Sequence, residues 1–148
     1  MKDPNVEALN KRTRFDVICT LIFAGLFAFN SVFKLFMHDP GTACSSAFLA
    51  VIFLLVGLIF LDIRKNGKPF ARSVITKIRI LAVTVMCSGI VSDIVESIVR
   101  SSREHFQFTL NLDDRFVIFT LLFGVVIGML SEVFVYGNAL QEENDLIA

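Results

Sequence analysis

Apolar residues gather in four long stretches, and the segments between them are polar. A helix needs about 20 predominantly apolar residues to cross the hydrocarbon core of a bilayer. The third stretch reaches that length only by continuing through Asp93 and Glu96, and the fourth by continuing through Glu132. The pattern predicts four transmembrane helices over about residues 15–37, 42–61, 76–99 and 115–136.

The composition agrees with a membrane protein. Of the 148 residues, 55% are hydrophobic and 19% are charged, and the mean hydropathy is +0.70. A soluble domain of this size has too little interior for so many apolar side chains. We therefore expect a single all-α domain, an integral membrane bundle of four transmembrane helices.

Basic residues predict the orientation of the chain. Ten Lys and Arg lie in the N-terminal segment and in the link between the second and third predicted spans, whereas three lie between the third and fourth spans. Loops rich in Lys and Arg stay in the cytoplasm. Both termini are thus expected there, including the tail 137–148. The formal net charge is zero, so charge does not indicate direct nucleic-acid binding.

Polar residues recur every four positions in the third predicted span, and they define one face of a helix. Such a face must meet protein or water rather than lipid. At 1.5 Å per residue, Lys34 lies roughly 28 Å along the first span, and Asp93 and Glu96 lie roughly 22 and 27 Å along the third. We expect Lys34 to pair with one of these carboxylates. The expected intramembrane polar cluster comprises Asn30, Lys34, Ser92, Asp93 and Glu96.

This cluster is open to more than one interpretation. It can be an ion pair that locks the helices together, with Lys34 extending toward water. Ionisable groups inside a membrane also mark ligand sites, ion sites and proton pathways.

The fourth predicted span contains Gly124 and Gly128 in a G-x-x-x-G motif, followed by Glu132. This motif allows two helix backbones to approach closely. It indicates packing within the bundle or, alternatively, a homo-oligomer contact. Glu132 comes roughly 24 Å after Phe116. We expect it to contact one of the basic residues Arg72, Lys77 or Arg79 near the cytoplasmic side.

Signatures of catalysis are missing from the sequence, which contains no H-E-x-x-H or G-x-S-x-G motif. The three cysteines lie in separate apolar stretches, as expected of free thiols. Two histidines lie near acidic residues in the predicted outer loops (His38, Asp39, Glu104, His105, Asp113 and Asp114). Histidines in short surface loops are usually solvated, so we expect no metal, no cofactor and no enzymatic activity.

Two cytoplasmic segments carry opposite charges and specific motifs. The basic link contains Asn66-Gly67-Lys68-Pro69-Phe70 and is followed by Ile78-Arg79. The acidic tail runs Tyr136-Gly137-Asn138-Ala139-Leu140-Gln141-Glu142-Glu143-Asn144-Asp145-Leu146, and Leu130-Ser131-Glu132 precedes it. With four spans, these segments resemble the bacterial membrane family catalogued as domain of unknown function 2975. Ile147-Ala148 departs from the family's usual continuation after Asp-Leu, which is Thr followed by Val or Ile.

The resemblance implies a four-helix protein of the bacterial inner membrane with no assigned activity. Members are often encoded beside a small helix-turn-helix regulator. This implies a non-catalytic regulator or sensor that binds a soluble cytoplasmic partner, such as a helix-turn-helix transcription factor. The implied cytoplasmic motif comprises Gly67, Pro69, Phe70, Gln141, Glu142, Glu143, Asp145 and Leu146. The alternatives are a small oligomeric transporter or channel and a structural membrane subunit.

Overall fold

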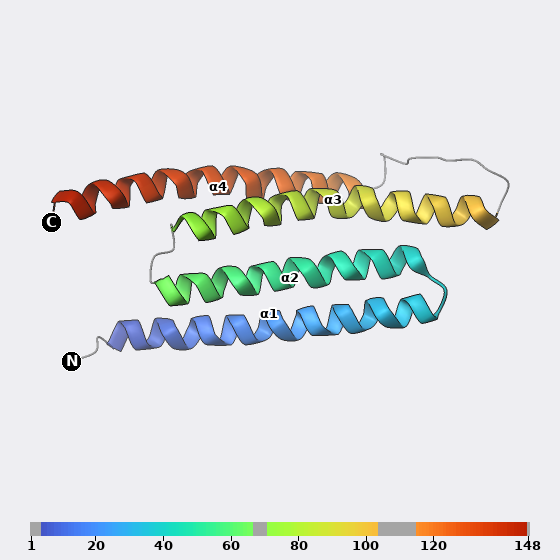
Figure 1. Ribbon diagram of the computed structural model, residues 1–148, viewed down its shortest axis with the longest axis horizontal. Helices are drawn as coiled ribbons and strands as arrows, with labels where there is room; N and C mark the ends of the chain where they lie inside the picture. Colours follow the sequence, from blue (N-terminus) through green and yellow to red (C-terminus); the bar gives the residue numbers. More distant parts are fainter. Residues whose placement is uncertain (1–3, 67–70, 104–114, 148) are drawn as a thin grey trace.

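The computed structural model consists of four long α-helices (Figure 1). The structure describes residues 4–66, 71–103 and 115–147, and these residues contain no strand. In chain order the helices are α1 (Pro4–Phe36), α2 (Pro40–Asn66), α3 (Arg72–Arg103) and α4 (Arg115–Ile147). The predicted all-α fold is therefore confirmed.

Each helix contains a segment that is long and apolar enough to cross a membrane. These segments are Thr13–Phe36, Pro40–Lys65, Arg72–Val99 and Arg115–Leu140. The third, which contains the predicted span with acidic residues, has a mean hydropathy of 1.9, equal to that of the first. Among the described residues, four helices are thus long and apolar enough to span a membrane, as predicted. The predicted tail 137–148 begins as a direct continuation of α4, which ends only at Ile147.

A three-residue connection joins α1 to α2. His38 has a φ of 59°, and a left-handed residue just past a helix end is a common way to stop a helix. Asp39 then caps α2, because its carboxylate accepts hydrogen bonds from the backbone N–H of Thr42 at 3.4 Å and from the Thr42 hydroxyl at 2.7 Å. Pro40 follows at the first helical position, where its missing N–H has no partner to lose.

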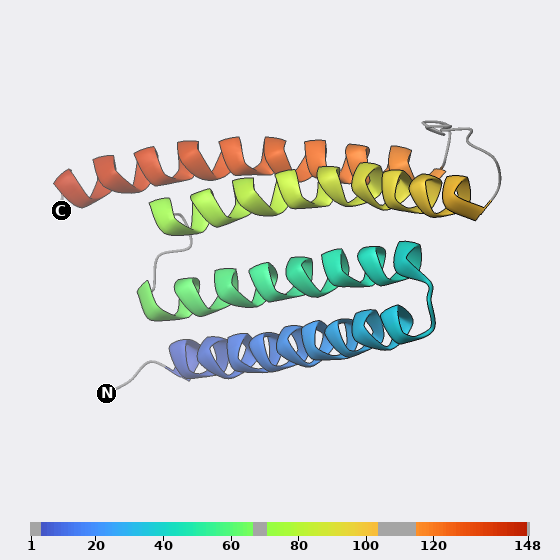
Figure 2. The same ribbon diagram turned by 45° about the vertical axis from the view of Figure 1, so that its right-hand side comes forward.

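The four helices pack as an open row in chain order (Figures 1 and 2). α2 contacts α1 and α3, and α3 contacts α4. Within the described residues, α1 makes no contact with α3 or α4, and α2 makes none with α4. The start of α1 and the end of α4 lie at one end of the row, which we call the terminal end. The α1–α2 connection lies at the opposite end, which we call the hairpin end.

α3 is the most buried of the four spans, as its polar face predicts. One seam packs against α2, where Val74 and Leu81 join Ile59 in an apolar core near the terminal end. A neighbouring seam, which includes Ala82 and Gly89, packs against α4. The outward faces of the row instead carry large exposed apolar side chains, which would meet acyl chains in a bilayer.

Candidate functional site

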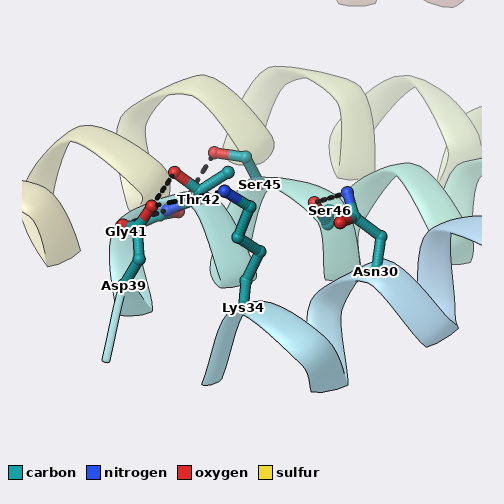
Figure 3. Close-up of polar contacts among 7 residues, drawn as sticks. All are labelled: Asn30, Lys34, Asp39, Gly41, Thr42, Ser45 and Ser46. Atoms are coloured by element: carbon teal, nitrogen blue, oxygen red, sulfur yellow. Dashed lines mark hydrogen bonds and ion pairs between the residues drawn. The ribbon is translucent and has the colours of Figure 1, made fainter. Parts of the chain in front are cut away.

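Polar side chains join α1 to α2 at the hairpin end (Figure 3). Asn30 donates from its amide nitrogen to the Ser46 hydroxyl at 3.2 Å. The buried Ser31 hydroxyl donates to the backbone carbonyl of Ala43 at 2.8 Å. In an apolar surrounding these bonds avoid the cost of unpaired polar groups. They fix the register of the two helices.

Lys34 extends from α1 toward the start of α2 (Figure 3). Its Nζ atom lies 3.9 Å from Oδ2 of Asp39. The predicted pair between Lys34 and Asp93 or Glu96 is wrong, because α2 lies between α1 and α3. The prediction compared only how far each residue lies along its helix, and that distance does not show which helices are neighbours. Asp39 lies only five residues further along the chain, at the start of the neighbouring helix. It is therefore closer to Lys34 than the carboxylates of α3 are.

Glu96 of α3 lies against the start of α2. A Cβ atom built on Gly41 would be 3.3 Å from Cβ of Glu96, so a larger residue at position 41 would require Glu96 to shift by a few tenths of an ångström. A cavity of about 470 Å³ next to this contact is lined by residues that include His38, Asp39 and Glu96. The acidic and histidine residues of the predicted outer loops do not form a metal site in the part that is described. Among the described residues, His, Cys, Asp and Glu side chains form no group of three suited to a metal ion. Glu104, His105, Asp113 and Asp114 lie outside the described residues.

Ser92 and Asp93 carry buried polar atoms in the same half of α3. Ser92 is only 6% exposed. In the part of the chain that the structure describes, neither its Oγ atom nor Oδ2 of Asp93 has a hydrogen-bond partner. An unpaired buried polar atom costs about 1–3 kcal/mol, and more where it is charged. The predicted cluster is thus divided between contacts of α1 with α2, a contact of Glu96 with α2, and unpaired atoms on α3.

The glycines of α4 lie on the face that packs against α3. A Cβ atom on Gly124 would lie 2.9 Å from the carbonyl oxygen of Ala82, whereas one on Gly128 would lie 4.0 Å from Cβ of Ala82. Glu132 accepts a hydrogen bond from Arg79 at 2.8 Å. The predicted packing role is therefore confirmed for Gly124, and the predicted contact of Glu132 with a basic residue is confirmed as Arg79.

An ion pair between Asp62 of α2 and Lys77 of α3 was not predicted from the sequence. Both side chains are largely covered, with exposed fractions of 21% and 28%. The sequence could have indicated this pair. Asp62 lies about one turn before the end of α2, and Lys77 lies about one turn after the start of α3. Such mirrored positions meet in an antiparallel helical pair.

A groove at the terminal end separates the start of α3 from the end of α4. Its volume is about 410 Å³, and Arg72 and Glu142 line opposite walls. Glu142 and Glu143 are exposed. Among the other predicted motif residues, Gly67, Pro69 and Phe70 lie outside the described residues. The remaining three residues belong to α4 (Gln141, Asp145 and Leu146), but the structure does not describe their side chains.

These features are those of a multi-pass membrane protein, and its ion pairs among the described residues lie toward the two ends of an apolar row of helices. Comparisons with protein-family models, with curated proteins and with solved structures each find no match.

Proposed function

We propose that this chain is a non-catalytic regulator or sensor of the bacterial inner membrane, and that its terminal end binds a soluble cytoplasmic protein. The observation that carries this proposal is the extension of α4. The candidate span ends at Leu140, but the helix continues to Ile147 and presents Glu142 and Glu143 to solvent. A helix that leaves the membrane with an exposed acidic surface can serve as a docking element for a basic partner.

A small helix-turn-helix regulator is the partner class that fits this proposal best. DNA-binding domains carry a basic surface for the phosphate backbone, so an acidic helix complements them. The resemblance to domain of unknown function 2975 supports the same partner class. A regulator held at this helix would be kept from DNA until the membrane protein changed its conformation.

The test is affinity purification of the tagged full chain in mild detergent, followed by mass spectrometry. A stoichiometric DNA-binding protein should accompany the wild type. It should be lost from a chain that ends at Leu140 and from Glu143→Lys. Asp39→Asn, at the hairpin end, is the matched control and should retain it. Recovery of the membrane protein alone would overturn the proposal.

The proposal also requires that the terminal end faces the cytoplasm. Glu143→Cys, in a chain whose Cys19, Cys44 and Cys87 are replaced by alanine, tests this requirement. An impermeant maleimide should leave intact cells unlabelled and react only after permeabilisation. Labelling of intact cells would place α4's end outside and contradict a cytoplasmic partner.

A small oligomeric transporter or channel is the second candidate function. The unpaired buried atoms of Ser92 and Asp93 favour it, since intramembrane polar groups without protein partners mark ion and proton pathways. The test is ion flux into reconstituted vesicles. Flux that Asp93→Asn abolishes would favour transport over the regulator.

A further inference from the structure

The groove between α3 and α4 lies where both membrane spans end. The α3 span begins at Arg72 and the α4 span ends at Leu140. The groove is lined by Arg72, Ile75 and Arg79 on one wall, and by Val135, Asn138 and Glu142 on the other. It therefore combines apolar and charged side chains at the depth where phospholipid head groups lie.

The two walls carry opposite charges, and among the described residues Arg72 on one wall and Glu142 on the other have no ion-pair partner. Within the described residues, Arg72 makes no ion pair, and it stands at the positive end of α3. Arg79 bonds Glu132 through one nitrogen, and a guanidinium has further N–H donors. On α4, the Glu142 carboxylate accepts a hydrogen bond from Asn138 at 2.9 Å but has no cationic partner among the described residues.

A ligand that fits this groove must bear an anion and a cation a short distance apart, next to an apolar part. We propose that the groove binds the head group of an amine-bearing zwitterionic phospholipid. The phosphate lies on the guanidinium of Arg72, with Arg79 beside it, because guanidinium groups bind phosphate oxygens through paired hydrogen bonds. The ammonium group donates to Glu142, and the glycerol end lies along Ile75 and Val135.

Two related lipids fit the groove less well. A choline head group carries the same charges, but its quaternary nitrogen has no N–H to donate to Glu142. An anionic glycerol head group meets Arg72 but faces the Glu142 carboxylate without a cation between them. The proposal is independent of any soluble partner, and it holds whichever side of the membrane the terminal end faces.

Native mass spectrometry of the full chain in detergent tests this site. The probes are phosphatidylethanolamine, phosphatidylcholine and phosphatidylglycerol with identical acyl chains. We expect phosphatidylethanolamine to bind most tightly. Arg72→Gln should weaken all three by roughly tenfold, the equivalent of one charge-assisted hydrogen bond. Glu142→Gln should remove most of the preference for ethanolamine over choline, because both lipids lose the attraction of the carboxylate but only ethanolamine also loses a charge-assisted hydrogen bond.

Glu143→Gln is the matched control, since its side chain is exposed one position away and does not line the groove. Equal binding of the three lipids would overturn the proposal, as would Arg72→Gln or Glu142→Gln behaving like this control. Tightest binding of phosphatidylglycerol would show a simple anion site and overturn the amine assignment. Equally tight binding of free phosphoethanolamine would show that the ligand is a soluble molecule rather than a lipid.

Discussion

Individual small residues set how closely α3 and α4 approach. A Cβ atom on Gly124 would lie 2.1 Å from Cγ of Met86 and 2.9 Å from the carbonyl oxygen of Ala82. A Met side chain can turn away, but a backbone carbonyl cannot without moving its helix. The neighbouring Gly128 has no such constraint, because its added Cβ would meet only Cβ of Ala82 at 4.0 Å.

This difference predicts opposite outcomes for two chemically identical substitutions. Gly124→Ala should lower the free energy of unfolding by about 1–3 kcal/mol, the usual cost of overpacking. Gly128→Ala should not lower it, because alanine fits there and favours a helix over glycine by about 1 kcal/mol. Equilibrium unfolding in mixed micelles, followed by circular dichroism, measures both. Equal destabilisation of the two variants would contradict the close contact at Gly124.

Ion pairs join consecutive helices toward the terminal end of the row. Asp62 and Lys77 connect α2 to α3, and Arg79 and Glu132 connect α3 to α4. The second pair is more solvent-accessible, with exposed fractions of 54% and 60%. Water and head groups screen an exposed pair, whereas a covered pair keeps more of its attraction.

Double-mutant cycles should therefore give a larger coupling energy for Asp62 with Lys77 than for Arg79 with Glu132. The exposed pair should contribute less than about 1 kcal/mol. The variants Asp62→Asn, Lys77→Gln, Arg79→Gln and Glu132→Gln, alone and in pairs, supply the measurements in micelles. A larger coupling energy for the exposed pair would show that screening by water and head groups does not determine which of the two ion pairs is stronger.

The contact of Glu132 with α3 was predictable from the sequence, because α3 and α4 are consecutive helices. Glu132 and Arg79 lie at similar heights on antiparallel neighbours, so depth alone led to a set of three basic residues that includes the correct partner. The same reasoning failed for Lys34, because α1 and α3 are not neighbours. Depth places a residue along the membrane normal, but the sequence pattern does not state which helices lie side by side. The Asp39 cap was also missed, because it depends on the geometry of a three-residue connection.

The four described helices form a row rather than a closed ring, and among them α1 contacts α2 alone. Packed helix axes lie about 8–10 Å apart, so α1 and α3 are separated by about two such distances. A disulfide requires Cα atoms within about 7 Å of each other. Cysteine pairs can therefore distinguish an open row from a closed bundle.

In a chain whose Cys19, Cys44 and Cys87 are replaced by alanine, oxidation should join neighbouring helices only. The pair Thr20→Cys with Gly57→Cys should link α1 to α2, because the two Cβ positions lie 3.8 Å apart. Gly41→Cys with Glu96→Cys should likewise link α2 to α3, across Cβ positions 3.3 Å apart. The pair Lys34→Cys with Glu96→Cys is the matched control, because it keeps the cysteine at position 96. It should remain reduced, since α1 and α3 are not neighbours. Mobility on non-reducing gels distinguishes a disulfide within one chain from a disulfide between two chains.

An efficient disulfide between residues 34 and 96 within one chain would contradict the open row. It would mean that α1 closes onto α3 in the membrane, and it would restore the direct pairing of Lys34 with the α3 carboxylates.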